Sequence, residues 1–127
     1  MARRSSDGLA PSEWKVMKIV WQLKSCVARD VYTRAGAEFG WSPNTVRTIL
    51  SRLVDKGFLK TTRVANCFVY RPARSFSRCL FDAADDLLDK TVAGRTGPLL
   101  SYMIQKGELS QEEITELRSL LDEQEKH

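Results

Sequence analysis

The sequence predicts a mostly helical α+β fold, in which three helices and a two-stranded ribbon precede three further helices. Three observations predict it. Apolar residues repeat with a helical period up to residue 57, the period changes to two over residues 59–71, and the helical period returns from residue 75. The 127 residues suffice for one compact domain with an appendage. We expect a disordered basic arm over residues 1–8, a compact domain over residues 9–74 and a helical region over residues 75–127.

The two halves of the chain carry opposite charge. Residues 1–75 hold 14 Lys and Arg against 5 Asp and Glu, whereas residues 76–127 hold 6 against 11. A basic surface is typical of a protein region that meets a polyanion. We therefore expect any nucleic acid to bind the front half and not the rear half.

The first helix is expected to begin at Pro11. Proline suits the first helical position, and Glu13 favours the positive end of the helix dipole. The helix is strongly apolar, and a tryptophan–methionine stripe at this spacing indicates packing rather than a ligand site. That stripe consists of Trp14, Met17 and Trp21.

The second helix is expected over roughly residues 28–39, after a break in the pattern at residues 24–26. Its apolar residues recur at a spacing of four, and Gly40 closes it. The next expected helix begins only three residues after this glycine. Two helices joined by so short a connection predict a helix-turn-helix.

The third helix has both a start and a stop signal. Ser42 can cap it ahead of Pro43, and Gly57 supplies the left-handed residue that ends it. One face is an apolar stripe, and the other carries short hydrogen-bonding side chains and two arginines, which are typical of residues that read base edges and hold phosphates. The competing interpretation is an ordinary solvated face. The polar face consists of Asn44, Thr45, Thr48, Ser51, Arg52 and Asp55, with Arg47 at its edge.

Two β-prone runs follow, over residues 59–64 and 67–71, with Ala65 and Asn66 between them. They predict a basic hairpin directly behind the third helix. Three helices followed by such a ribbon form the winged-helix variant of the helix-turn-helix, and the ribbon is expected to hold phosphates.

We expect the third helix to enter the major groove of DNA. Thr48 is expected to contact a thymine methyl group, whereas Arg52 can contact either a guanine or a phosphate, and the sequence leaves both roles open. Arg47, Arg63 and Arg74 are expected to engage phosphate. The full expected DNA-binding set is Ser42, Asn44, Thr45, Arg47, Thr48, Ser51, Arg52, Lys60, Arg63, Asn66, Arg71 and Arg74.

The rear region is expected to form three amphipathic helices. They cover residues 75–89, a stretch from Pro98 to Gly107, and a stretch after a capping box at Ser110–Glu113, with a break at residues 93–97. An acidic, leucine-lined helical tail more often pairs with a second copy than covers its own domain, so we expect a homodimer that reads a palindrome. The expected dimerisation residues are Phe76, Leu80, Leu87, Leu99, Leu100, Met103, Ile104, Ile114, Leu117 and Leu121.

The sequence contains no motif that indicates an enzyme, a metal-binding protein or a membrane protein. The sequence has no glycine-rich phosphate loop and no carboxylate–histidine or cysteine–histidine cluster, so we expect no enzyme. The three cysteines fit no zinc spacing, so we expect neither metal nor cofactor. No apolar run approaches the roughly 18 residues of a membrane span, and we expect a cytoplasmic protein without membrane insertion. Cys79 is expected in the core and Cys67 in the ribbon.

The rival from another functional class is a winged-helix protein-interaction module without sequence-specific DNA binding, because the same fold also serves for docking. The basic front half and the Thr/Asn/Arg face argue against it. A redox switch at Cys26 or Cys67 is a further, weaker alternative.

Four motifs carry a resemblance to a known family. They are the opening Glu13-Trp14-x-Val16-Met17-x-x-Val20-Trp21, the central Ser42-x-x-Thr45-Val46-Arg47-Thr48-Ile49-x-x-Arg52-Leu53, the exit Lys56-Gly57-Phe58-Leu59 and the tail Glu112-Glu113-Ile114-x-Glu116-Leu117. With them, residues 9–122 resemble the penicillinase repressor family of bacterial transcription regulators. The resemblance implies a homodimeric repressor that occupies a palindromic operator and blocks transcription.

The resemblance also implies a release route. In the β-lactam branch of the family, a membrane sensor of the metallopeptidase type triggers cleavage within the dimerisation region. The corresponding segment is Ser101, Tyr102, Met103 and Ile104, and Tyr102-Met103 stands where that branch has an Asn–Phe pair. The copper-responsive branch has clustered cysteines near its C-terminus, and that motif is not present in this sequence.

Overall fold

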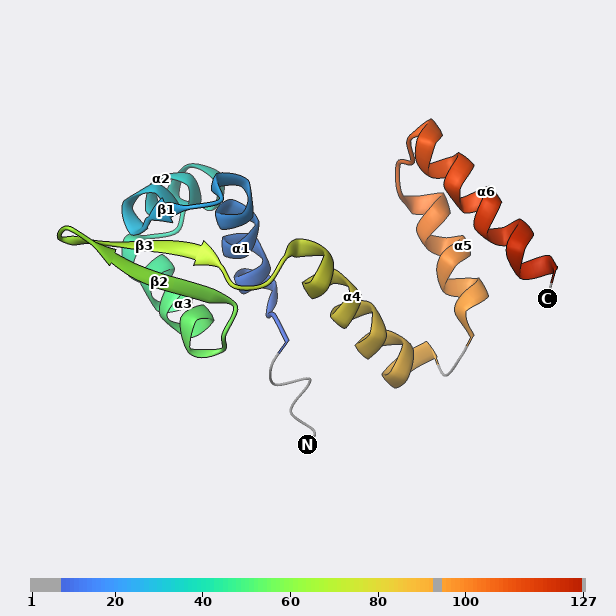
Figure 1. Ribbon diagram of the computed structural model, residues 1–127, viewed down its shortest axis with the longest axis horizontal. Helices are drawn as coiled ribbons and strands as arrows, with labels where there is room; N and C mark the ends of the chain where they lie inside the picture. The colour runs from blue at the N-terminus through green and yellow to red at the C-terminus, as the bar shows by residue number, and fades with distance from the viewer. Residues whose placement is uncertain (1–7, 93–94, 127) are drawn as a thin grey trace. The chain divides into compact units, whose positions relative to one another are not determined.

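The computed structural model describes residues 8–92 and 95–126, which form two compact units divided after Asp86 (Figure 1). The first unit contains helices α1 (Pro11–Leu23), α2 (Ala28–Phe39) and α3 (Pro43–Asp55), strands β1 (Cys26–Val27), β2 (Leu59–Val64) and β3 (Cys67–Pro72), and helix α4 (Phe76–Leu87) up to the division. The second unit contains the π-helical turn η1 (Leu88–Val92) and helices α5 (Thr96–Lys106) and α6 (Gln111–Glu125). The expected domain boundary after residue 74 stays a prediction.

The start and stop signals of the first three helices are confirmed. Pro11 is the first residue of α1, and α2 has the expected bounds. Ser42 Oγ accepts a hydrogen bond from the backbone N–H of Thr45 at 3.3 Å, which caps α3. Gly57 has a φ of 85°, which glycine adopts at no steric cost.

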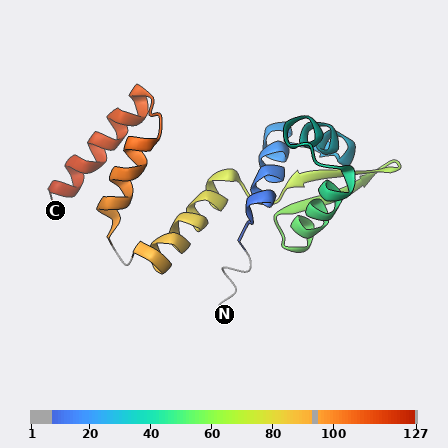
Figure 2. The ribbon, with the colours of Figure 1, turned by 180° about the vertical axis from the view of Figure 1, so that it is seen from behind.

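The three strands form one antiparallel sheet in the order β1-β3-β2. Strands β2 and β3 form the expected hairpin, with Val64 opposite Cys67 beside the turn. In both ribbon views the hairpin tip projects beyond the helices of the first unit (Figure 1, Figure 2). Strand β1, where Cys26 pairs with Tyr70, was not expected from the sequence. Two residues are too short to show a strand period, and the pairing that stabilises them is distant in sequence.

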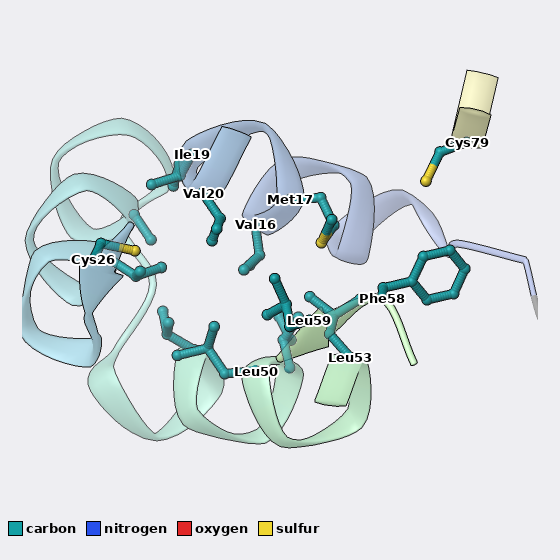
Figure 3. Close-up of a cluster of buried hydrophobic side chains, with 14 residues drawn as sticks. Val16, Met17, Ile19, Val20, Cys26, Leu50, Leu53, Phe58, Leu59 and Cys79 are labelled. Atoms are coloured by element: carbon teal, nitrogen blue, oxygen red, sulfur yellow. The ribbon is translucent and has the colours of Figure 1, made fainter. Parts of the chain in front are cut away.

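The core lies where the inner faces of α1, α2 and α3 meet the start of β2 (Figure 3). Each large aliphatic side chain that is fully buried there stabilises the fold by about 1.5–3 kcal/mol. The aromatic residues Trp14 and Trp21 pack at the edge of this core, and the Trp21 and Phe76 rings lie 5.3 Å apart. The fully or nearly buried members are Val16, Met17, Ile19, Val20, Cys26, Val31, Ala35, Val46, Ile49, Leu50, Leu53, Phe58, Leu59 and Cys79.

Two of the three rear helices have slightly different bounds from those expected. The helix expected over residues 75–89 changes to a π-helical turn at Leu88, and α5 begins at Thr96, two residues before Pro98. Residues 93 and 94 of the expected break lie outside the described residues. The capping box of α6 is confirmed, because Ser110 and Glu113 exchange hydrogen bonds of 2.9 and 3.1 Å.

Candidate nucleic-acid interface

Helix α3 presents a polar stripe to solvent because its opposite stripe is buried. Val46, Leu50 and Leu53 are at most 1% exposed, so packing against the core fixes the rotation of the helix about its axis. The polar side chains then point outward. All expected DNA-binding residues except the half-buried Arg74 are exposed.

Hydrogen bonds organise the first turns of this stripe. Arg47 Nη1 donates to Asn44 Oδ1, and the Arg47 guanidinium lies 5.8 Å from the ring centre of Tyr32 on α2. A cation–π contact at an exposed site is worth about 0.5–1 kcal/mol. Thr48 Oγ1 donates to the Asn44 carbonyl oxygen at 3.0 Å, which leaves its methyl group available for an apolar contact. Tyr32 was not among the expected site residues.

Each cationic side chain of the hairpin has a neighbour on the opposite strand. Arg63 lies opposite Phe68 in the strand register, with the guanidinium 5.7 Å from the ring centre. Lys60 lies directly opposite Arg71, and Arg71 Nη2 also donates to Thr62 Oγ1 at 2.9 Å. Like charges at directly opposite positions of an antiparallel pair are destabilising. A bound anion would remove that cost.

Arg74 does not lie on the hairpin. It follows β3, where its backbone oxygen accepts a hydrogen bond from Trp21 Nε1 at 2.9 Å. Its guanidinium lies 4.5 Å from the ring centre of Phe58. The structure therefore places Arg74 at the base of the hairpin, separate from Arg63 near the tip.

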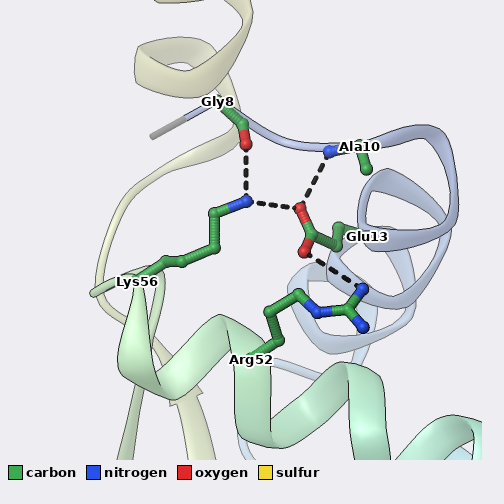
Figure 4. A network of polar contacts seen from close by, with 5 residues as sticks. All are labelled: Gly8, Ala10, Glu13, Arg52 and Lys56. Atoms are coloured by element: carbon green, nitrogen blue, oxygen red, sulfur yellow. Dashed lines mark hydrogen bonds and ion pairs between the residues drawn. The ribbon is translucent and has the colours of Figure 1, made fainter. Parts of the chain in front are cut away.

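A buried carboxylate lies at the other end of α3 (Figure 4). Glu13 of α1 is 1% exposed and contacts both Lys56 and Arg52. Burial raises its pKa, but the hydrogen bonds from Lys56 and from the Ala10 N–H, together with the charges of Lys56 and Arg52, outweigh burial and hold the pKa below its usual value. From the sequence, Glu13 was expected only to favour the positive end of the helix dipole. Its pairing with Lys56 was not expected, because the two residues are about forty positions apart in the chain.

The rear helices expose most of the expected dimerisation residues. Leu99, Ile114 and Leu117 are partly buried, and the other seven are exposed. Phe81 and Leu120 are also large, exposed apolar side chains, at 61% and 51% exposure, although they were not among the expected dimerisation residues. Clusters of exposed large apolar side chains mark interaction surfaces.

The cysteines take the expected places. Cys79 is buried and Cys67 is exposed on β3, while burial raises the pKa of the Cys26 and Cys79 thiols. Over residues 8–92 and 95–126, no three His, Cys, Asp or Glu side chains gather to hold a metal ion. Within the same ranges, no helix combines the length and the apolar character needed to cross a membrane.

A family model and related proteins identify one family. The model of a family described as "Penicillinase repressor" matches residues 9–123. The methicillin resistance regulatory protein MecI of Mammaliicoccus sciuri is 31% identical over 114 residues, which cover 90% of this chain and 93% of that protein. The penicillinase repressor of Bacillus licheniformis is 30% identical over 115 residues, covering 91% of this chain and 90% of that protein.

Solved structures of related repressors match about half of the chain. The DNA-binding domain of the repressor BlaI is 33% identical, with a TM-score of 0.51, over 54% of this chain and 84% of that one. Bacillus licheniformis BlaI, solved as a monomer in complex with the blaP half-operator, is also 33% identical, with a TM-score of 0.50 and the same coverage.

Proposed function

The chain belongs to the penicillinase repressor family, and we propose that it represses transcription by binding a palindromic operator as a homodimer. It is a DNA-binding transcriptional repressor. Repression by occupancy competes with the polymerase for DNA and requires no bond to be made or broken. Since the operator of a bacterial gene lies in the cytoplasm, the repressor acts there.

One observation supports the proposal most strongly. Helix α3 is capped at its start and buried on one face, and its other face presents a polar stripe to solvent beside a basic hairpin. Asn44, Thr45 and Thr48 lie in the first two turns of α3, and residues at the start of a recognition helix are the ones that meet base edges. Lys60 and Arg71 lie opposite one another on the hairpin, where one phosphate can neutralise their mutual repulsion.

The homodimer is supported by the exposed apolar side chains of the rear helices. Leu100, Met103 and Ile104 are each 44% or more exposed on α5, and Leu121 is 57% exposed on α6. Burying such side chains between two copies removes them from water. A two-fold dimer presents two copies of α3, so its operator is an inverted repeat.

Release by proteolysis is the route that family membership suggests, with a membrane sensor of the metallopeptidase type as the trigger. The segment Ser101, Tyr102, Met103 and Ile104 is exposed, but it lies inside α5. A protease needs an extended strand of substrate, so cleavage there requires local opening of the helix.

A fluorescence titration with duplex DNA at two salt concentrations tests the proposed function. The probes are a random-sequence duplex and a duplex selected by the protein from a random library. We expect salt-dependent binding to both and tighter binding to the selected duplex. A protein that enriches no duplex from the library and does not bind the random duplex at low salt would instead be an interaction module of the same fold.

A further inference from the structure

A charged cluster joins the start of α1 to the end of α3. Glu13 Oε1 accepts hydrogen bonds from the Ala10 N–H and from Lys56 Nζ, both at 2.8 Å, and Glu13 Oε2 lies 3.7 Å from Arg52 Nη1 (Figure 4). Apolar packing between the two helices is non-directional. The carboxylate adds directional contacts at one end of the DNA-binding helix.

The two cations of the cluster, Lys56 and Arg52, differ in their hydrogen-bond partners and in their exposure. Lys56 donates to Glu13 and, at 2.7 Å, to the carbonyl oxygen of Gly8, and its side chain is 21% exposed. Its donors are directed at the protein. The Arg52 side chain is 49% exposed and contacts Glu13 through one terminal nitrogen. A guanidinium has five N–H donors in a rigid plane, so most of the Arg52 donors remain for a second anion.

The position of Arg52 along α3 indicates what that second anion is. Arg52 follows Asn44 by eight residues. At 1.5 Å per residue these two side chains are separated by about 12 Å along the helix axis, which is about the width of the major groove. When the first turns of a recognition helix lie over base edges, its C-terminal end can contact the phosphate backbone, and Arg52 lies toward that end of α3.

We propose, on the basis of the function proposed above, that Glu13 is a positioning residue for DNA binding. It holds the guanidinium of Arg52 toward a backbone phosphate and keeps Lys56 directed into the protein. An arginine that is already oriented loses less conformational freedom when it binds. Glu13 thus strengthens DNA binding although it carries the same sign of charge as DNA.

The negative charge of Glu13 makes the proposal testable, because a positioning role and a simple charge effect predict opposite changes in DNA affinity. Glu13→Gln keeps an oxygen acceptor for Ala10 and Lys56 but removes the charge that holds Arg52. If Glu13 acted only through the overall field, the loss of a negative charge would tighten binding to any duplex. If it positions Arg52, binding weakens by about 3- to 10-fold on the selected and the random duplex alike.

A double-mutant cycle separates positioning from a general effect on folding. Titrations compare the wild type, Glu13→Gln, Arg52→Gln and the double variant, with Arg63→Gln in place of Arg52→Gln as the control cycle. We expect Glu13→Gln to have no further effect once Arg52 is removed, and to keep its full effect in the Arg63→Gln background. An unchanged or tighter affinity of Glu13→Gln, or an equal loss in both backgrounds, would overturn the proposal.

A matched pair of variants covers the case in which Glu13→Gln does not fold. Arg52→Gln and Lys56→Gln each remove one cation from the same cluster. We expect Arg52→Gln to reduce the log–log salt slope of DNA binding by about 0.9, and Lys56→Gln to leave that slope unchanged. Equal slopes for the two variants would contradict the assignment. A wild-type protein without duplex binding would instead refute the proposed function itself.

Discussion

Two exposed side chains of the candidate interface are expected to contribute in different ways. Thr48 on α3 offers a methyl group, and Arg63 on the hairpin offers a charge stacked on Phe68. A direct base contact is worth about 1–3 kcal/mol of discrimination, whereas a neutralised phosphate adds about −0.9 to the log–log salt slope.

These roles give paired predictions for Thr48→Ala and Arg63→Ala. Thr48→Ala should lower the preference for the selected duplex over a random duplex, with the salt slope unchanged. Arg63→Ala should weaken binding to both duplexes equally and reduce the slope. Fluorescence titrations of both variants on both duplexes at several salt concentrations provide the check. If the two variants lost affinity in the same manner, α3 and the hairpin would have been assigned the wrong roles.

The buried carboxylate Glu13 predicts a pH dependence of stability. Its pKa in the folded protein is lower than its ordinary value of 4.5. Its charged contacts therefore stabilise the fold fully above about pH 4.5, and the contribution is lost as pH falls through the folded-state pKa. Wild type should unfold at a higher denaturant concentration than Glu13→Gln at pH 7, and the difference should shrink in acid. The control variant is Glu116→Gln, which removes an exposed carboxylate from α6. A difference that grew in acid would contradict the assignment.

At the residue level, local chemistry could be predicted from the sequence and distant partners could not. Ser42 and Gly57 act within one or two turns of chain, so their residue types were enough to predict where α3 begins and ends. The contacts of Glu13 with Lys56 and of Arg47 with Tyr32 join separate helices. Such contacts depend on how the helices pack, which a residue type alone does not determine.

At the level of elements, the start of α3 is expected to depend on its cap. Ser42→Ala removes the oxygen that accepts from the Thr45 N–H and should cost about 0.5–2 kcal/mol of unfolding free energy. Ser51→Ala is the matched control on the same helix, where alanine is the better helix former and stability should rise slightly or not change. Urea denaturation of both variants measures the difference. Equal changes would show that the cap is dispensable.

Elements with a long periodic pattern could be predicted from the sequence, and very short elements could not. Helices α1 to α3 and the hairpin carry long periodic patterns, and they were predicted. Strand β1 has two residues and depends on its pairing with β3, and the π-helical turn η1 follows an uninterrupted helical pattern. Neither has a periodic signal of its own.

For the whole molecule, the proposed homodimer would present two DNA-binding helices, one from each copy, and the exposed apolar side chains of α6 test it. Leu121→Arg changes a side chain that is 57% exposed. In a monomer such a surface change is worth at most about 0.5 kcal/mol. In the proposed dimer it should shift the protein toward monomer and weaken binding to a palindromic duplex more than to a half-site. Sedimentation equilibrium and titrations on the two duplexes are the measurements. The charge-matched control is Ser119→Arg, which adds the same single positive charge at another exposed position of α6. A monomeric wild type would contradict the dimer.

The distribution of the three thiols has a practical consequence. Cys26 and Cys79 are buried with a raised pKa, while Cys67 is exposed on the hairpin. A mild alkylating reagent should therefore modify Cys67 alone. Since the hairpin is expected to lie against the DNA backbone, duplex should slow that modification, and mass spectrometry of the intact chain would follow occupancy without any engineered label.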